Sequence, residues 1–533
     1  MSGAPSRVLP ALAAAIGLLA LAACGAADVR TGETRIQAVN AYGGDRSAEG
    51  TPQPGGTLRI GMDREPASFD PTVQNANPAA FAVYDTLMRL TPDGTTQPYL
   101  AESMDTPDDG RTWRMRLRPG VTFSDGTPLD ADAVLLNVQR HVDAPSTPAR
   151  TAAQSIASMR ALDPLTVEFA LTSPLGAFPA VFAQPIFAGS LGMIISPAAL
   201  EQQGDAIGEH PVGAGPFRLV EWVRDSRIVL ERNPTYWQQG MPYLDGLEFR
   251  PLSDTESRYA SIQNGDVDVI LAAYNQELVR ALQNPDLAVY YGPGDSGELL
   301  YFNFARAPFD DRRMREAVVR ALDLQALSAS LYNNQLVPAQ SLFGETSPYH
   351  SAQATQAWPA FDQERARQLV AEYRAGGGST AVALKTTTAR GQFGEFVQAQ
   401  LAAVGIDVDV ELFDLARYSA EVVQSGDFDL TTTVSSFDTP FPPVQRLLGT
   451  GGSANYGTYS NPQVDALLAE AASTGDEARR DAAYQQVELV VNEDLAVCWL
   501  SRAYLATITR TTVKGVDRYP SREMFFATLW RSG

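Results

Sequence analysis

Residue types that could carry catalysis are few and scattered in this 533-residue chain. Its three histidines, His141, His210 and His350, lie far apart, and no His-Glu-x-x-His or Cys-x-x-Cys motif brings metal ligands together. No Gly-x-x-x-x-Gly-Lys-Ser/Thr loop occurs, so we do not expect the chain to bind ATP itself. Paired acids at 108–109 and 310–311 are typical of turns and helix caps. The sequence therefore predicts no catalytic pair, no metal and no cofactor.

One tetrapeptide, Gly294-Asp-Ser-Gly297, matches the segment around the nucleophile of chymotrypsin-like proteases. That chemistry requires a histidine base and a buried aspartate, both of which precede the serine in those enzymes. Here Glu298 stands where a second glycine normally follows, and neither upstream histidine has the expected neighbours. The helical patterns below also contradict an all-β double barrel. We therefore expect the chain not to be an enzyme.

The cysteine with a predicted chemical role is Cys24. Residues 1–23 combine one cation, at Arg7, with a small-apolar run, Val8–Ala23, which is too short to span a bilayer comfortably. Leu21-Ala-Ala-Cys24 resembles the bacterial lipobox, in which the cysteine is diacylated after cleavage. We expect residues 1–23 to be a signal peptide and 24–54, polar and without periodicity, to be a lipidated flexible tether.

Composition narrows the partners. The formal charge of −21, with lysine only at positions 385 and 514, argues against nucleic acid and against clusters for anionic lipid. If Cys24 is lipidated, Cys498 has no partner for an intramolecular disulfide. Its apolar neighbours predict a buried, inert thiol.

Hydrophobic periodicity predicts mixed strands and helices without an internal repeat, and therefore α/β lobes. Removing 23 of 533 residues leaves 510, more than one hydrophobic core usually organises. The strand candidates are Thr57–Met62, Thr112–Leu117, Thr166–Leu171, Phe217–Val223, Ile228–Arg232, Leu247–Pro251, Val267–Leu271, Leu299–Phe304, Ala381–Thr386, Val408–Phe413 and Leu430–Val434. The helix candidates are Ala79–Arg89, Ala131–His141, Thr255–Asn264, Arg312–Leu322, Gln363–Tyr373, Phe393–Val404, Ala416–Ser425, Val464–Ala472 and Glu477–Asn492.

Several short motifs occur in one order between about residue 55 and residue 510. They are Gln97–Ser103, Asp109–Trp113, Leu117–Pro128, Asp130–Val134, Val212–Phe217, Asn233–Trp237, Asn264–Asp268, Phe302–Asn303, Pro308–Asp311, Met314–Ala317 and Ser460–Asp465. Together they resemble the dipeptide/oligopeptide/nickel solute-binding proteins, the family 5 or cluster C components of ABC importers. Each motif also has a structural interpretation. Gly126 suits a tight turn, Thr127 or Asp130 suits a helix cap, and Gly213 and Gly215 suit close backbone approach.

The resemblance implies a two-lobed, periplasmic-binding-protein-like fold of type II with mixed sheets and a double hinge crossover. Lobe I would contain 55–297 and the returning segment 505–533, and lobe II would contain 298–504. The first crossover would fall near 292–297, where Gly-Pro-Gly-Asp-Ser-Gly independently predicts a bend, and the second near 498–504. Ligand would bind between lobes that close by hinge motion.

The resemblance also implies ligand-binding residues. Family members that bind peptides hold the α-ammonium with an aspartate just beyond a lobe II strand, and Asp438 in Val434–Pro442 matches it. Ser435 or Phe437 stands where many members have tryptophan. On lobe I a loop that supplies backbone contacts matches at 75–77, and Trp499 matches an aromatic position of the cleft. The candidate ligand-binding residues are Asn75, Asn77, Ser435, Ser436, Phe437, Asp438 and Trp499.

These candidates also have structural alternatives: Asp438 as a turn residue, Asn75 and Asn77 as helix-capping loop residues, and Trp499 as core. The function implied is that of a monomeric, membrane-tethered extracytoplasmic lipoprotein that binds peptides and delivers them to an ABC permease and ATPase. Two alternatives stay open. The same fold could bind a metal chelate, an oligosaccharide or another polar solute, or the lipoprotein could be a sensor that delivers nothing.

Overall fold

The predicted mixture of strands and helices is organised into three main sheets. A computed structural model describes residues 40–533 except 74–76, 92–94, 145, 146, 148, 186–189, 274, 293, 294, 333, 335, 415, 416, 436, 438, 503–505 and 519–522. The signal peptide, Cys24 and the predicted tether up to residue 39 lie outside the described residues, as do Asn75, Ser436 and Asp438. Residues 40–54 of the predicted tether are described, and two of them contact the C-terminal segment of lobe I: the backbone N–H of Arg518 donates to the carbonyl oxygen of Tyr42 at 3.2 Å, and that of Gly515 donates to Glu49 Oε2 at 2.6 Å.

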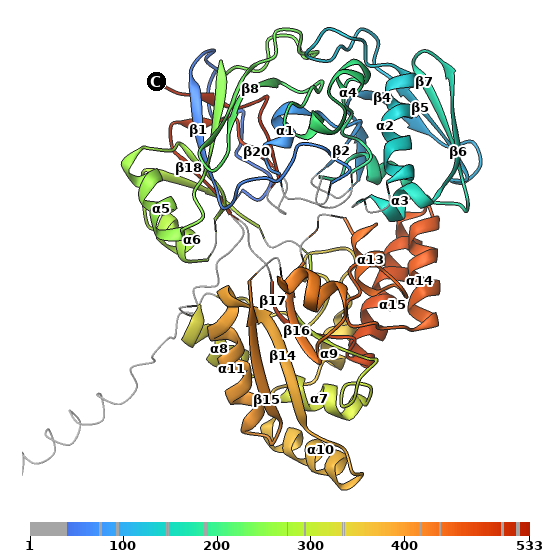
Figure 1. Cartoon of the computed structure of the whole chain (residues 1–533), viewed down its shortest axis with the longest axis vertical. Helices are drawn as coiled ribbons and strands as arrows, with labels where there is room; N and C mark the ends of the chain where they lie inside the picture. Colours follow the sequence, from blue (N-terminus) through green and yellow to red (C-terminus); the bar gives the residue numbers. More distant parts are fainter. Residues whose placement is uncertain are drawn as a thin grey trace, which may run out of the picture. The chain divides into compact units, whose positions relative to one another are not determined.

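Two sheets build the part of the chain that we call lobe I (Figure 1). The seven-stranded sheet is mixed and has the order β12 (Leu287–Tyr290), β18 (Ala506–Arg510), β11 (Val269–Ala273), β1 (Thr57–Met62), β10 (Gly246–Pro251), β9 (Arg227–Arg232) and β8 (Phe217–Val223). The four-stranded sheet is antiparallel and has the order β4 (Ala101–Asp105), β5 (Thr112–Leu117), β7 (Thr166–Leu171) and β6 (Ile156–Asp163). Three small two-stranded sheets pair β2 (Met88–Leu90) with β3 (Thr96–Pro98), β19 (Val513–Lys514) with β22 (Trp530–Arg531), and β20 (Asp517–Arg518) with β21 (Met524–Phe525).

A third sheet builds lobe II. Its order is β15 (Asp407–Phe413), β14 (Ala381–Thr387), β16 (Leu430–Val434), β13 (Gly297–Phe302) and β17 (Val497–Arg502). The helices of lobe I are α1 (Ala80–Val83), α2 (Ala131–Asp143), α3 (Arg150–Gln154), η1 (Phe178–Phe182), α4 (Pro197–Gln203), η3 (Gly204–Gly208), α5 (Thr255–Asn264) and α6 (Asn275–Leu282). Those of lobe II are α7 (Arg312–Ala321), α8 (Leu324–Leu331), α9 (Ala352–Ala357), α10 (Gln363–Ala375), η4 (Thr388–Arg390), α11 (Gly391–Ala402), η5 (Tyr418–Gln424), α13 (Pro443–Leu448), α14 (Pro462–Ser473) and α15 (Glu477–Asp494).

The chain passes between the two lobes twice. It leaves the seven-stranded sheet after β12 to enter β13, and it returns after β17 to enter β18. Because β13 and β17 are antiparallel neighbours, both connections leave lobe II at the same end of its sheet. They lie in close contact there, since a Cβ on Gly297 would come within 1.8 Å of the carbonyl oxygen of Ser501. This connectivity matches the predicted double crossover; the boundaries at residues 297 and 504 stay predictions.

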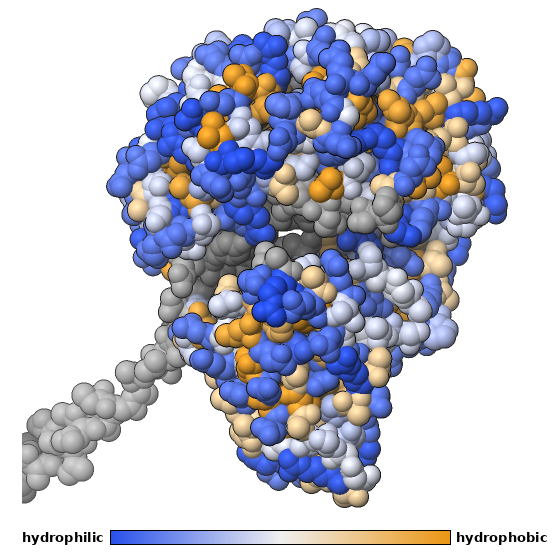
Figure 2. Space-filling view, in the orientation of Figure 1, coloured by the Kyte–Doolittle hydropathy of each residue, from blue (hydrophilic) through white to orange (hydrophobic). Residues whose placement is uncertain are grey.

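Buried apolar side chains form two clusters, one for each lobe. The first contains Leu58 and Phe249 of the seven-stranded sheet, and the second contains Leu384 of the five-stranded sheet. Two residues of lobe II, Phe441 and Ala472, belong to the lobe I cluster, so they are buried against lobe I. The face drawn in Figure 2 is mostly hydrophilic, with a strip of hydrophobic residues over the region of β14 and β15.

The turn before α2 forms as predicted. Gly126 has φ +87°, and the backbone N–H of Thr127 donates to Oδ1 of Asp125 at 2.9 Å. Of the two predicted caps, Asp130 is the one that begins α2, because its Oδ1 accepts from the backbone N–H of Ala133 at 3.0 Å.

The prediction that Gly213 and Gly215 allow another backbone segment to approach closely is confirmed. A Cβ on Gly213 would lie 2.2 Å from the carbonyl oxygen of Val83, and a Cβ on Gly215 would lie 2.5 Å from it.

Asp311 accepts from the backbone N–H of Arg313 at 2.8 Å and caps α7, which is the structural role expected for that paired acid.

One predicted helix is wrong. Ala79–Arg89 is helical only over α1, and its end lies in strand β2. Asp85, between the two, is 3% exposed and accepts from Tyr236 Oη at 2.9 Å and Trp237 Nε1 at 2.7 Å. Burial raises the pKa of Asp85 to about 6 against these hydrogen bonds. The contacts of Asp85 with Tyr236 and Trp237, which lie 151 and 152 positions away in the sequence, thus override the local helical pattern.

Candidate functional site

One end of the five-stranded sheet contains the described part of the predicted ligand segment. The parallel strands β14 and β16 finish at this end, and β13, antiparallel to β16, begins there. The backbone N–H of Ser435 donates to the carbonyl oxygen of Gly297 at 2.9 Å and extends the ladder beyond β16. Phe437 then forms an isolated antiparallel bridge with Asp295. Ser435 and Phe437 therefore lie beside the first crossover.

Four polar side chains meet at the same end of the sheet, and we call them the strand-end cluster: Glu298, Tyr332, Arg390 and Ser501. Arg390 Nη2 donates to Glu298 Oε1 at 3.0 Å, while Tyr332 Oη and Ser501 Oγ each donate to Oε2 at 3.1 Å. The side chains of Arg390 and Glu298 are 24% and 15% exposed, so both charges are partly desolvated but reachable. Burial and the charge of Glu298 raise the pKa of Tyr332, which keeps the phenol protonated. Because Glu298 pairs with Val434 in the sheet, a carboxylate and the guanidinium bound to it lie at the start of the predicted ligand segment.

Two charged side chains at the crossovers, the half-buried Asp295 and the buried Arg502, support this end of the sheet. Asp295 accepts from the backbone N–H of Gly344 at 2.9 Å and from Ser347 Oγ at 3.0 Å, and burial raises its pKa. Arg502, 9% exposed, donates to the carbonyl oxygens of Leu342 at 2.8 Å and Ser296 at 3.3 Å. The segment after residue 341 is therefore fastened to both crossovers.

A third charged side chain, the buried Glu488 of α15, holds the same segment by hydrogen bonds. Its Oε1 accepts from the backbone N–H of Phe343 at 2.7 Å and its Oε2 from that of Ser351 at 2.5 Å. Burial raises the pKa of Glu488 to about 7 in spite of these hydrogen bonds. His350 Nδ1 lies 3.5 Å from Oε2. Structural hydrogen bonds account for this acid.

The described lobe II candidates differ from one another in exposure. Ser435 is partly exposed at the end of β16, whereas Phe437 is 4% exposed and its ring centroid lies 6.3 Å from that of Phe343. Trp499 is 1% exposed within β17, and its Nε1 donates to Asn492 Oδ1 at 2.8 Å, the core position given above as its structural alternative. Their ligand roles stay predictions.

Asn77 lies in lobe I, where its Nδ2 donates to the carbonyl oxygen of Ser68 at 2.9 Å. Among the described residues its buried Oδ1 has no hydrogen-bond partner. Close by, Asp70 pairs with Arg140 at 2.6 Å. Burial acts to raise the pKa of Asp70, but hydrogen bonds from Thr72 and Arg140 hold it below its ordinary value.

Sequence reasoning missed the strand-end cluster. Arg390 follows β14 by three residues, and Glu298 stands second in β13. The available signal was positional: both charges lie where the ends of strands β14 and β13 meet the end of β16. Reading it required the order of strands in the sheet, which the sequence did not supply.

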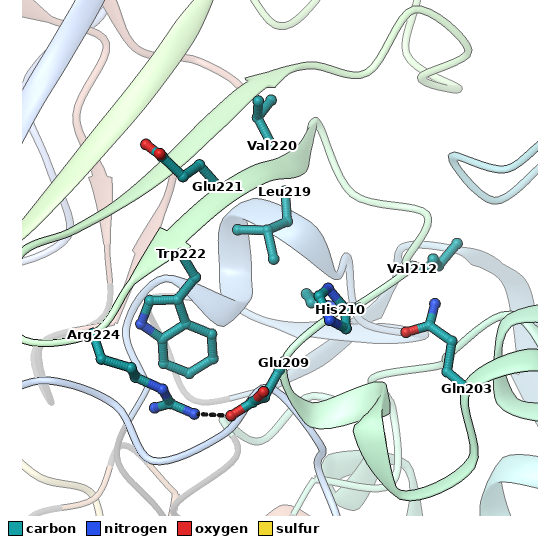
Figure 3. A pocket seen from close by; sticks show the side chains of 10 residues that line it. Gln203, Glu209, His210, Val212, Leu219, Val220, Glu221, Trp222 and Arg224 are labelled. Carbon is teal, nitrogen blue, oxygen red and sulfur yellow. Dashed lines mark hydrogen bonds and ion pairs between the residues drawn. The ribbon is translucent and has the colours of Figure 1, made fainter.

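A separate cavity of about 320 Å³ lies in lobe I between β8 and the segment 203–212 (Figure 3). Glu209 and Arg224 form an ion pair at 2.6 Å across it, and the Arg224 guanidinium lies 3.7 Å from the centre of the Trp222 ring. Trp222 Nε1 in turn donates to Glu65 Oε1 at 2.8 Å. The charges of this cavity are satisfied within the chain, and none of the candidate residues lines it.

The three histidines lie in three different parts of the structure. His141 Nδ1 lies 2.9 Å from Thr147 Oγ1, and burial with the nearby Arg140 charge lowers its pKa to about 4. His210 lines the lobe I cavity, and His350 contacts Glu488. Over the described ranges, no three His, Cys, Asp or Glu side chains are grouped to hold a metal ion.

In the part of the chain that the structure describes, no helix has the length and apolar character needed to cross a membrane. Cys498 is buried, as predicted, and burial raises its pKa to about 12.

Comparison with known proteins identifies the family. The family model described as "Bacterial extracellular solute-binding proteins, family 5 Middle" matches residues 95–457. The glutathione-binding protein GsiB of Salmonella paratyphi A is 30% identical over 448 residues, which cover 80% of this chain and 84% of that protein.

Solved structures agree in fold. DppA of Helicobacter pylori, in complex with the peptide STSA, aligns with a TM-score of 0.78 at 23% identity, over 90% of this chain and 99% of that one. AgaA of Agrobacterium tumefaciens R10, in complex with agropinic acid, aligns with a TM-score of 0.79 at 24% identity, over the same shares. The chain therefore belongs to family 5 of the bacterial extracellular solute-binding proteins, which bind solutes and are not enzymes.

Proposed function

We propose that the chain is the extracytoplasmic binding component of an ABC importer and that it captures short peptides with free ends. The ligand lies between the lobes and is handed to a membrane permease after the lobes close. The partners are the permease and ATPase subunits, and the protein acts as a monomer without a cofactor.

The observation that carries this proposal is the pairing of opposite charges at one end of the lobe II sheet. Arg390 and Glu298 lie at the end of the sheet where Ser435 extends β16. In the sequence, Asp438 follows Ser435 by three residues. A short peptide carries an ammonium at one end and a carboxylate at the other. Asp438 suits the ammonium, and Arg390 suits the carboxylate through charge-assisted hydrogen bonds. Backbone pairing beyond β16 would then accept varied side chains.

The glutathione-binding relatives support the same ligand class, because glutathione is a tripeptide derivative with one ammonium and two carboxylates. Relatives of the same fold are also solved with agropinic acid and with a nickel–histidine complex, so other polar solutes remain the alternative. A sensor lipoprotein without transport is the second alternative. Neighbouring genes for permeases and ATPases would favour transport.

We expect Arg390→Gln to weaken binding of reduced glutathione or an unblocked tripeptide by roughly 10- to 150-fold, because one charged hydrogen-bond partner is worth about 1.5–3 kcal/mol. Amidation of the ligand carboxylates should weaken binding to the wild type by a similar factor. Isothermal titration calorimetry measures both.

The control for this substitution is Arg306→Gln, which removes an arginine paired with Asp427 at the opposite end of the same sheet. It should leave the affinity unchanged. Full affinity of the wild type for the amidated ligand would remove Arg390 from the site. Failure of peptides and glutathione to bind at millimolar concentration, together with a co-purifying sugar or metal chelate in a native mass spectrum, would overturn the peptide proposal.

We also propose that Cys24 anchors the protein to the outer face of the membrane. Two or three acyl chains, at roughly 0.8 kcal/mol per buried methylene, bind stably where one chain does not. Cys24→Ser should abolish labelling by a fatty-acid probe and release soluble or uncleaved protein. The matched control is Cys498→Ser, which removes the other cysteine and should leave labelling intact. Undiminished labelling of Cys24→Ser would contradict the anchor.

A further inference from the structure

We propose that residues 175–177 of lobe I and the carboxyl end of α14 in lobe II form a latch that holds the lobes together and thereby strengthens ligand binding. The latch consists of Leu175, Gly176 and Ala177 on one side and Ala472, Ser473 and Thr474 on the other. Its effect on ligand affinity rests on the proposed function, but its effect on the lobes does not.

The contact joins the carboxyl end of α14 to the two residues that precede η1. The last turn of an α-helix leaves carbonyl oxygens unsatisfied, and the first turn of a helix leaves N–H groups unsatisfied. Here the backbone N–H of Gly176 donates to the carbonyl oxygen of Ser473, and that of Ala177 to the carbonyl oxygen of Ala472, both at 3.1 Å. Helix η1 begins directly after Ala177. Two carbonyl oxygens at the end of α14 therefore find their donors in lobe I.

The lobe I side of the latch is held rigidly in place. Trp113 Nε1 donates to the carbonyl oxygens of Leu175 and Gly110, both at 3.2 Å. The backbone N–H of Leu175 donates to Gly110 at 3.0 Å, and that of Phe178 donates to Leu175 at 3.2 Å. Little conformational freedom remains to be lost when the loop meets α14, so the two interlobe hydrogen bonds are preorganised.

Apolar burial accompanies these hydrogen bonds. Ala472 is 6% exposed and belongs to the hydrophobic cluster of lobe I, whereas its neighbour Ala471 belongs to that of lobe II. Phe441 is likewise 6% exposed in the lobe I cluster. Because Phe441 lies three residues after Asp438, the same docking of the lobes buries the end of the predicted ligand segment. The latch and the ligand site are therefore two parts of one interlobe contact.

Gly176 makes this contact sterically demanding. A Cβ at this position would lie 2.5 Å from the carbonyl oxygen of Thr474 and 2.9 Å from the backbone nitrogen of Gly475. Its three nearest atoms all belong to lobe II, and Gly176 does not have the positive φ that disfavours other residues. The closest atoms that an added methyl group would meet thus belong to lobe II, so we expect the methyl group to be resisted mainly when the lobes are docked.

The test compares Gly176→Ala with Gly475→Ala in the full-length mature protein. Gly475 lies across the same contact, but its Cβ would meet nothing within 4 Å and its φ is not positive. For Gly176→Ala we expect a larger radius of gyration by small-angle scattering and about 10-fold faster hydrogen exchange of the 176 and 177 amides. We also expect about 10-fold weaker binding of reduced glutathione. Gly475→Ala should match the wild type in all three measurements.

A second variant protects the result against a folding defect. Ala472→Lys places a long charged side chain on the docked surface, while its positive charge is favourable at a helix carboxyl end. It should open the lobes in the same way with unchanged circular dichroism. Unchanged scattering and exchange in both variants would overturn the latch, whatever the ligand is. Absence of glutathione binding by the wild type, with altered scattering in the variants, would instead contradict the proposed ligand and leave the latch standing.

Discussion

Asp438→Asn is expected to weaken binding of an unblocked peptide by two to four orders of magnitude. If Asp438 pairs with a desolvated peptide ammonium, the substitution removes the charge but nearly keeps the shape, and breaking a buried charge pair costs about 3–5 kcal/mol. N-acetylation of the peptide should cause a comparable loss in the wild type. The two losses should not add, because both remove the same interaction.

Calorimetry of the wild type and Asp438→Asn with free and acetylated peptide closes this cycle. Asp427→Asn is the matched control, because Asp427 pairs with Lys385 and Arg306 just before β16, at the end of the sheet opposite the site. Additive losses, or full affinity for acetylated peptide, would remove Asp438 from the site and leave the fold unaffected. A binder of sugars or metal chelates would show neither the acetylation effect nor the coupling.

The strands were the most predictable part of the fold. Thr112–Leu117, Thr166–Leu171 and Leu430–Val434 are strands over the predicted residues. In Thr112–Leu117 buried and more exposed positions alternate between the two faces of the sheet, which is local information. Longer helices with one buried face, such as α2 over Ala131–Asp143, which was predicted over 131–141, were predictable from their periodicity.

Short helices were not predictable in this way. Helices α8 and α9 contain eight and six residues, too few to show a helical period, and their positions depend on contacts with the rest of lobe II. The segment predicted as a helix at 416–425 adopts a π-helix over Tyr418–Gln424, where Tyr418 Oη donates to the carbonyl oxygen of Thr432 at 2.6 Å. This tertiary contact is invisible in the sequence.

The candidate site divides along the same line. Its candidate residues came from the resemblance of Val434–Pro442 to the family's ligand segment, and the predicted strand Leu430–Val434 places Ser435 directly after it. Glu298 belongs to β13 and Arg390 to η4, directly after β14, and only the order β14-β16-β13 brings them to one end of the sheet. Gly176 carries no sequence signal at all, because the atoms that require a glycine there belong to residues 474 and 475.

The largest stability effect is expected in lobe I, at the ion pair of Arg258 and Glu277. Both side chains are 0% exposed, and the pair is bidentate, with Nε–Oε1 at 2.8 Å and Nη2–Oε2 at 2.6 Å. Glu277→Gln keeps the shape but leaves a buried guanidinium without its counter-charge. We expect the free energy of unfolding of this region to fall by about 3–5 kcal/mol.

The exposed pair between the same two helices provides the control for this prediction. Arg280 and Glu256 lie 2.7 Å apart with side chains 42% and 67% exposed, so Glu256→Gln should change stability by less than about 1 kcal/mol. Replacing both buried charges, as Arg258→Met with Glu277→Leu, should recover part of the loss, because no uncompensated charge remains. Full recovery is not expected, since Arg258 Nη1 also donates to the carbonyl oxygen of Leu252 at 2.7 Å. Urea unfolding followed by hydrogen exchange of α5 and α6 measures all three variants, and equal effects of Glu277→Gln and Glu256→Gln would show that burial does not determine the strength of these pairs.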